Sequence, residues 1–225
     1  MSLAKIPGRT DFVDAVYTRL VDAISDGTLA PGERIKQENL AEQLNVSRSP
    51  VLQALRLLKK EGLLEEAPGR GLVVARLDPV RIGHLYQVRG ALDALAARLA
   101  AERRAQIPSS LISAGRAAAQ GSDVRAMIDA DIAFHRAIYE ASGNPLLLEN
   151  ALLHWIHLRQ VMGAVLQRSS ARLTIWDEHE AILQAVQCGD AERAAALSER
   201  HAALARDSLV SHLAQSLQPP PARAA

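Results

Sequence analysis

The chain has 225 residues, 48% of them hydrophobic and only 3% aromatic, and its formal net charge at pH 7 is +1. This length and apolar content allow two modest domains with buried cores. The near-neutral charge excludes binding to nucleic acid through bulk positive charge, so a DNA-binding surface would depend on where the cations are placed.

The first predicted elements are two short helices joined by a tight turn. The pattern predicts a helix from about Gln37 to Leu44 and a turn at residues 45–46. Ser47 is the expected N-cap of the next helix, and Pro50 lies within its first turn, where no intrahelical N–H is needed. Two helices in this order are typical of a helix-turn-helix motif.

The second of these helices has the features of a DNA-recognition helix. Its apolar face repeats at i, i+3, i+4 and i+7, at Val51, Ala54, Leu55 and Leu58. Its opposite face is polar and basic, without an acidic residue, at Ser49, Gln53, Arg56 and Lys60. Such a helix can enter a major groove, where side chains near its start reach base edges and phosphate contacts fix the register. The alternative is a solvated surface helix, which the flanking elements disfavour.

A hairpin is expected directly after this helix. Residues 63–66 and 72–75 can pair as strands around Pro68-Gly69-Arg70-Gly71. The tip holds one cation, Arg70, which could contact a minor groove or a phosphate, or remain solvated. The order of elements predicts a winged helix-turn-helix over residues 1–76, with three helices and a β-hairpin wing.

Several motifs of this region resemble the GntR family of bacterial transcription regulators, among them Val46-Ser47-Arg48-Ser49-Pro50-Val51, Glu61-Gly62-Leu63 and Gly69-Arg70-Gly71. The resemblance implies that Arg48, after the helix-opening serine, contacts the operator. A second operator-contacting arginine of the family is absent, because the usual Pro-Val-Arg-Glu-Ala-Leu reads Pro50-Val51-Leu52-Gln53-Ala54-Leu55 here.

Since Leu52 cannot donate a hydrogen bond to guanine, we expect base reading to shift toward Ser49, Gln53 and Arg56. Gln53 can form a two-point contact with adenine. The full set of expected DNA contacts is Ser47, Arg48, Ser49, Gln53, Arg56, Lys60 and Arg70.

Residues 77–79 are the expected linker, because Asp78-Pro79 disfavours helix before the proline and permits it afterwards. An Ala-, Leu- and Arg-rich composition then predicts an all-helical domain over residues 80–216. Its helices are expected at about 79–103, 108–120, 123–141, 145–168, 172–188 and 191–216. Residues 217–225 are expected to form a flexible tail that includes three prolines. The predicted fold class is therefore mainly α.

Cys188 is the only cysteine, which excludes an internal disulfide and a cysteine-based zinc site. No apolar run reaches the roughly 18 residues that span a bilayer. Asp11 and Asp14 interrupt the N-terminal stretch, which lacks a secretory pattern. We therefore expect a cytoplasmic protein without a membrane partner.

The predicted helical domain directs one carboxylate and three imidazoles inward. Asp131 and His135 lie four residues apart on one apolar stripe, His179 lies on a second, and His201 shares a third with Leu197 and Leu204. Burying such groups without partners would cost about 1–3 kcal/mol each, and a divalent metal would remove that cost. The alternative for any one of these histidines is a hydrogen-bonded core residue.

Motifs around these residues, Asp131-xxx-His135-xxx-Tyr139, Glu178-His179 and Arg200-His201, resemble the FCD ligand-binding domain of the FadR branch of GntR regulators. The resemblance implies that Asp131, His135, His179 and His201 bind one divalent ion per chain. Mixed nitrogen and oxygen ligands suit Zn²⁺, Ni²⁺ or Mn²⁺. Four protein ligands leave two octahedral positions, which a small carboxylate could fill.

Arg89 and Arg159 are cations on otherwise apolar stripes. An inward arginine needs an anion, and its planar fork suits a carboxylate, either of the protein, such as Asp93, or of a ligand. We expect both arginines to bind a ligand. The alternative is an internal ion pair or a side chain that reaches the solvent.

The sequence therefore predicts a ligand-responsive transcription regulator, in this family most often a repressor. It would bind a palindromic double-stranded operator as a homodimer and sense a small organic acid at its metal site. Two alternatives stay open: a regulator whose metal is structural or is itself sensed, and a metal-dependent hydrolase. We expect no enzymatic activity.

Overall fold

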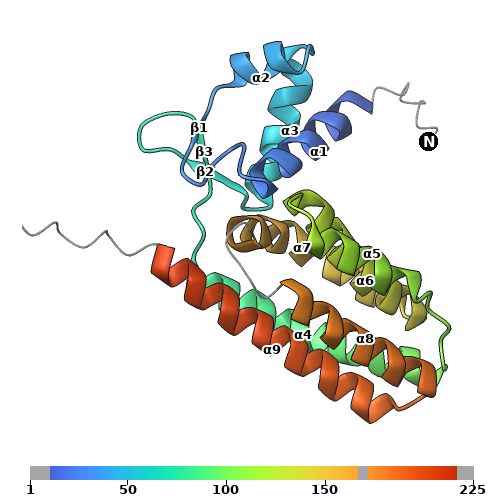
Figure 1. The fold of residues 1–225 in the computed structure, drawn as a ribbon. Helices are drawn as coiled ribbons and strands as arrows, with labels where there is room; N and C mark the ends of the chain where they lie inside the picture. Colours follow the sequence, from blue (N-terminus) through green and yellow to red (C-terminus); the bar gives the residue numbers. More distant parts are fainter. Residues whose placement is uncertain (1–10, 167–171, 217–225) are drawn as a thin grey trace, which may run out of the picture. The chain divides into compact units, whose positions relative to one another are not determined.

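The computed structural model describes residues 11–166 and 172–216, which are mainly helical (Figure 1). Contacts divide the chain into two compact units, Met1–Arg76 and Leu77–Ala225. The assignment of residues 77–79 as a linker stays a prediction. None of the helices in the described ranges has the length and apolarity that crossing a membrane requires.

The first unit has three helices, α1 (Asp11–Ser25), α2 (Gln37–Gln43) and α3 (Arg48–Lys60). Its small antiparallel sheet has the order β1-β3-β2, from β1 (Arg34–Ile35), β2 (Leu64–Glu66) and β3 (Leu72–Val74). The predicted winged helix-turn-helix is confirmed. The sequence does not predict β1, because a two-residue strand shows no alternation of apolar and polar positions.

The four apolar positions predicted for α3 are buried, with exposures of 1% or less at Val51, Ala54, Leu55 and Leu58. They pack against α1, so the opposite, polar face of α3 is left outside. Ser47 is the N-cap of α3, as predicted, but its side chain makes no capping hydrogen bond.

The second unit contains α4 (Pro79–Glu102), α5 (Ser110–Gln120), α6 (Val124–Ala141), α7 (Pro145–Leu166), α8 (Arg172–Cys188) and α9 (Ala191–Ser216). Asp78 caps α4 by accepting from the N–H of Val80, and Pro79 follows in the first turn. The predicted helices agree with these bounds to within two residues. Residues 167–168 of the predicted fourth helix and the predicted tail lie outside the described residues.

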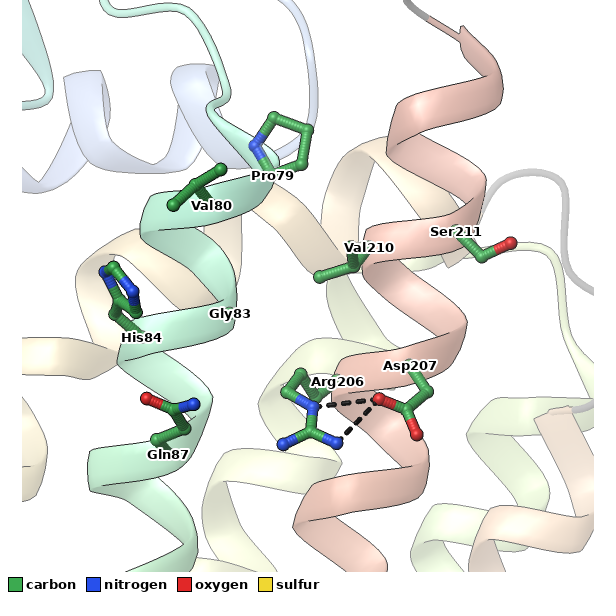
Figure 2. Close-up of a pocket in the computed structure, with 9 residues that line it drawn as sticks. All are labelled: Pro79, Val80, Gly83, His84, Gln87, Arg206, Asp207, Val210 and Ser211. Atoms are coloured by element: carbon green, nitrogen blue, oxygen red, sulfur yellow. Dashed lines mark hydrogen bonds and ion pairs between the residues drawn. The ribbon is translucent and has the colours of Figure 1, made fainter.

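α4 and α9 form the most extensive helix pair of this unit (Figure 1). Small residues let them approach closely: a Cβ at Gly90 would lie 3.3 Å from the Cβ of Ala202. Near the start of α4 a surface groove opens between them, with His84 and Gln87 on the α4 side and Asp207 on the α9 side (Figure 2). Arg206, also in the groove, is ion-paired with Asp207. The groove is separate from the buried residues described next.

Candidate metal centre and nucleic-acid interface

Three helices bring the four predicted metal ligands together. Asp131 and His135 come from α6, His179 from α8 and His201 from α9, and each offers a ligand atom that lies within 4.8 Å of the others. All four are buried, with exposures between 0% and 7%. These residues are called the histidine cluster below. Their positions are consistent with a metal site.

The inward atoms of the histidine cluster are Nε2 nitrogens and a carboxylate oxygen. Nε2 of His179 lies 3.2 Å from Nε2 of His201 and 3.5 Å from Oδ1 of Asp131. Nε2 of His135 lies 3.9 Å from the same oxygen. Asp131 and His135 share one face of α6 because residues four apart lie one above the other on a helix. Three nitrogens and one oxygen facing one point form a mixed donor set that suits a divalent transition metal.

Two carboxylates lie beside the Nδ1 atoms of His201 and His135, on the side of each ring that faces away from the centre of the cluster. Nδ1 of His201 lies 2.8 Å from Oε2 of Glu178, and Nδ1 of His135 lies 3.6 Å from Oδ1 of Asp93. A carboxylate behind a histidine fixes the Nδ1–H tautomer, so that the Nε2 lone pair is available to a metal. The sequence does not predict this role for Glu178 or Asp93.

Two buried polar atoms of the histidine cluster have no hydrogen-bond partner among the described residues, Oδ2 of Asp131 and Nδ1 of His179. Buried polar groups are rarely left in this way. The other oxygen of this carboxylate, Oδ1, is the one that lies beside the imidazoles of His179 and His135. A cation bound to the carboxylate would also satisfy its Oδ2 atom. The residues present therefore fit the metal that the sequence motifs imply.

Burial lowers the pKa of two of the three imidazoles. The pKa of His179 is well below its ordinary value, mainly through burial and then through electrostatic interactions with His201, His135 and Arg89. Burial and then Arg89 also lower the pKa of His135, although Asp93 and Asp131 oppose the shift. A neutral imidazole is the form that binds a metal.

Arg89, from α4, lies against the histidine cluster. Its Nε donates to Oδ2 of Asp93 over 3.2 Å and its Nη1 donates to the hydroxyl of Tyr86 over 3.3 Å. Its Nη2 donates to Nε2 of His135 over 2.7 Å and lies 3.7 Å from Oδ2 of Asp131. Arg89 therefore contacts a protein carboxylate and the histidine cluster at the same time. A metal bound to Nε2 of His135 would replace the hydrogen bond from Arg89, because this nitrogen has a single lone pair.

The surroundings of Arg89 keep it charged. Its guanidinium lies over the indole of Trp155, 4.6 Å from the ring centroid. Burial favours the neutral form of both Arg89 and Asp93, but their mutual attraction, with that of other neighbours, raises the pKa of Arg89 and lowers the pKa of Asp93. Asp93 also accepts from the hydroxyl of Tyr139. Burial raises the pKa of Tyr86 to about 12.

Two details of the predicted site differ from the structure. Arg159 does not join Arg89: its Nη2 forms an ion pair with Oδ1 of Asp129 at 3.1 Å, and its side chain is 21% exposed. Its expected role in ligand binding stays a prediction. Leu204, predicted to share an inward stripe with His201, is 45% exposed, because the buried face of α9 continues through Leu209 and Leu213 instead.

All seven expected DNA contacts are exposed. Six lie at the start or on the polar face of α3, and Arg70 lies in the turn between β2 and β3. Nη1 of Arg48 lies 3.5 Å from a carboxylate oxygen of Glu38, and Nε2 of Gln53 donates to the hydroxyl of Ser49 over 3.3 Å. These side chains stay available to a duplex, because both partnerships are solvent-exposed and therefore weak.

Comparison with known families accounts for both units. Residues 12–74 match the model described as bacterial regulatory proteins of the gntR family, and residues 84–204, more than half of the chain, match the FCD domain. The chain belongs to the GntR family, and its second unit is an FCD domain. This GntR/FCD protein is thus a DNA-binding transcription regulator, since the family consists of regulators rather than enzymes.

Relatives and solved structures agree. The GntR/FCD regulator is 29% identical over 204 residues to an HTH-type transcriptional regulator of Streptomyces ambofaciens, covering 88% of this chain and 85% of the relative. It is 30% identical over 201 residues to a probable D-xylose utilization operon transcriptional repressor of Paenarthrobacter nicotinovorans, covering 87% of each chain. The structure of McbR/YncC of Escherichia coli shares its fold, with a TM-score of 0.78, 23% identity, and 93% and 100% coverage.

Proposed function

We propose that this regulator is a repressor whose DNA binding responds to a small carboxylate at a metal site formed by Asp131, His135, His179 and His201. One observation carries the proposal: three Nε2 atoms and a carboxylate oxygen converge in a buried position beside the guanidinium of Arg89. When bound, a divalent ion such as Zn²⁺, Ni²⁺ or Mn²⁺ would offer open coordination positions to an anion.

Arg89 supports an acidic effector because it brings an extra positive charge to the same position. Its Nη2 atom is directed to the histidine cluster, while Asp93 holds the other side of the guanidinium. Because Nε donates to Asp93 and Nη1 donates to Tyr86, Nη2 is the nitrogen that would donate a charge-assisted hydrogen bond to a carboxylate effector. Asp93 thus fixes the direction in which Arg89 presents its Nη2 atom.

The DNA-binding unit supports recognition of a palindrome by a homodimer. One recognition helix reads only a few base pairs, and two-fold operators mirror two-fold proteins. The similarity to a probable transcriptional repressor of Paenarthrobacter nicotinovorans supports repression rather than activation. The base-reading residues proposed for this chain are Ser49, Gln53 and Arg56.

The first test is a native mass spectrum of the untagged protein. We expect a dimer that carries one transition metal per chain, together with the mass of any organic acid that co-purifies. If the protein stays metal-free after incubation with Zn²⁺, Ni²⁺ and Mn²⁺, the proposed metal site is wrong. The assignment as a DNA-binding regulator does not depend on this result.

The second test measures DNA affinity, with a duplex that the wild-type protein has selected from a random-sequence pool. A panel of small organic acids is added to the metal-loaded protein at saturating concentration. A ligand can shift DNA affinity only by its differential affinity for the two states of the protein. If the DNA affinity is the same with every acid as without it, the proposed sensing mechanism is wrong.

A metal that is structural or is itself sensed is the second candidate, because complete burial of His179 favours a closed site. It predicts that removal of the metal with a chelator, rather than addition of an acid, changes DNA affinity. The same titration with chelator-treated protein therefore separates the two candidates.

A further inference from the structure

A side chain from outside the hairpin holds the tip of the wing, residues 67–71. Arg34 lies in β1, and its Nη1 donates to the backbone carbonyl of Arg70 over 2.9 Å, while its Nη2 donates to the carbonyl of Pro68 over 3.1 Å. One guanidinium therefore bridges two carbonyl groups on either side of Gly69. The rigid fork of N–H donors suits two acceptors, whereas the single ammonium group of a lysine does not fix both.

Two glycines flank Arg70 in the backbone that Arg34 bridges. Gly69 and Gly71 have φ angles of +95° and +99°, and a Cβ at either position would meet no atom within 4 Å. The backbone conformation, rather than crowding, therefore favours glycine there, and glycine has the most conformational freedom to lose on ordering. A hydrogen bond from the N–H of Ala67 to the carbonyl of Gly71 closes the base of the tip.

Arg34 itself is anchored in the sheet. It pairs with Val73 in the antiparallel register of β1 and β3, and the next residue, Ile35, is buried. The guanidinium thus connects the exposed tip to the packed part of the unit. A movement of the tip away from β1 would lengthen both hydrogen bonds.

The cation of the tip is Arg70, whose exposed side chain forms no ion pair or hydrogen bond with the described residues. We propose that Arg34 is a positioning residue for DNA binding, which fixes the direction in which the side chain of Arg70 leaves the wing. This inference rests on the proposed DNA contact of Arg70. Ordering the tip before DNA binds reduces the entropy that binding would otherwise lose.

The alternative role for Arg34 is a direct contact with a DNA phosphate, since its side chain is exposed. The experiment must distinguish this role from the positioning of Arg70. The two roles differ in their dependence on Arg70. A positioning residue loses its effect when Arg70 is absent, whereas a phosphate contact keeps its effect.

The experiment is a double-mutant cycle with Arg34→Met, Arg70→Ala and the double variant, in the full-length protein. Affinity is measured over a range of salt concentrations for the duplex selected by the wild-type protein. Arg19→Met removes one exposed positive charge from α1 of the same unit and is the matched control. Thermal unfolding of each variant checks that the fold is retained, and amide hydrogen exchange of Ala67, whose N–H donates to the carbonyl of Gly71, reports on the tip without DNA.

We expect Arg34→Met to weaken binding about three- to tenfold, as the loss of one or two hydrogen bonds implies. In the Arg70→Ala background it should have no further effect within about twofold. Either single substitution should reduce the slope of log affinity against log salt by about one. Exchange at the tip should accelerate in Arg34→Met and not in Arg19→Met.

Additive effects of the two substitutions, or unchanged exchange at the tip, would overturn the inference. If Arg70→Ala weakens binding and Arg34→Met does not, the positioning role alone fails. If Arg70→Ala has no effect, the proposed DNA contact of the wing fails, and the positioning role fails with it.

Discussion

Nδ1 of His201 lies 2.8 Å from Oε2 of Glu178, the residue directly before His179 in α8. One turn of a single helix thus supplies a member of the histidine cluster and the carboxylate that orients another member. Glu178 is only partly exposed, with 32% of its side chain accessible. Its effect on His201 does not require it to touch the metal.

Glu178→Gln should therefore weaken metal binding without removing a ligand. A glutamine can keep the shape but not the negative charge that stabilises the Nδ1–H tautomer, and substitutions of such outer residues typically cost about 10- to 100-fold in metal affinity. Competition with a chromophoric chelator measures the affinity. Glu180→Gln is the matched control on the same helix, because Glu180 pairs with Arg116 instead. Equal losses in both variants would contradict the role of Glu178.

Arg89→Met should destabilise the protein by about 3–5 kcal/mol, because it leaves the carboxylate of Asp93 buried without its partner. The double variant Arg89→Met/Asp93→Asn should recover part of this loss, since the unpaired charge is removed. Urea unfolding measures both. Arg136→Met, which breaks an exposed pair with Glu140, should cost less than about 1 kcal/mol. A double variant less stable than Arg89→Met would contradict this account.

The stability of metal-free protein should fall as the pH drops below about 6.5. The pKa of His179 in the folded protein is well below its ordinary value of 6.5, mainly through burial, so the unfolded chain binds more protons below that pH. The free energy of unfolding then rises with pH in this window, by up to about 1.4 kcal/mol per pH unit for each such residue. His179→Phe should flatten the dependence between pH 5 and pH 7, as followed by urea unfolding, whereas His212→Gln on the exposed face of α9 should not.

The sequence predicted the four members of the histidine cluster because polar residues interrupt apolar helical stripes at their positions. It could not predict the roles of Glu178 and Asp93, since a carboxylate near a helix face is equally compatible with solvent until the packing of the neighbouring helix is known. The orientations of Arg159 and Leu204 also differ from the prediction, because they depend on how each helix is rotated in the bundle. The fold was more predictable, because the helices from α2 onward and the wing have local start and stop signals, whereas the sequence predicts neither the bounds of α1 nor the two-residue β1.

Gly115→Ala should destabilise the protein. A Cβ at this position of α5 would lie 2.0 Å from atoms of the Trp176 ring, and forcing an extra methyl group into a packed core typically costs about 1–3 kcal/mol. Trp176 packs edge-on against His179, with 4.7 Å between ring centroids, so metal affinity should also fall. The measurements are urea unfolding and chelator competition.

The matched control is Gly83→Ala in α4. A Cβ there would meet no atom within 4 Å, and alanine in a helix is about 0.5–1 kcal/mol more stable than glycine. The two glycine substitutions should thus have opposite signs. A stabilising Gly115→Ala would show that the Trp176 ring can move aside.

Gln53→Ala should relax base discrimination more than it weakens binding. Gln53 is exposed on α3 beside Ser49, where its amide can make a two-point contact with adenine, and such a contact gives about 1–3 kcal/mol of discrimination. Selection from a random-sequence pool by the variant and the wild type is the measurement. Lys60→Ala, which removes a charge from the same face, should weaken binding to all duplexes alike. Identical selected sequences for Gln53→Ala and the wild type would exclude Gln53 from base reading.

Both tryptophans of the chain lie at the histidine cluster. Trp155 packs against His135, with 5.5 Å between ring centroids, and beneath the guanidinium of Arg89, while Trp176 packs against His179. The DNA-binding unit has no tryptophan. The tryptophan fluorescence of the unlabelled protein therefore originates beside the proposed metal and effector site alone. Quenching or a spectral shift on adding metals and acids would give binding curves for that site, even while DNA is bound.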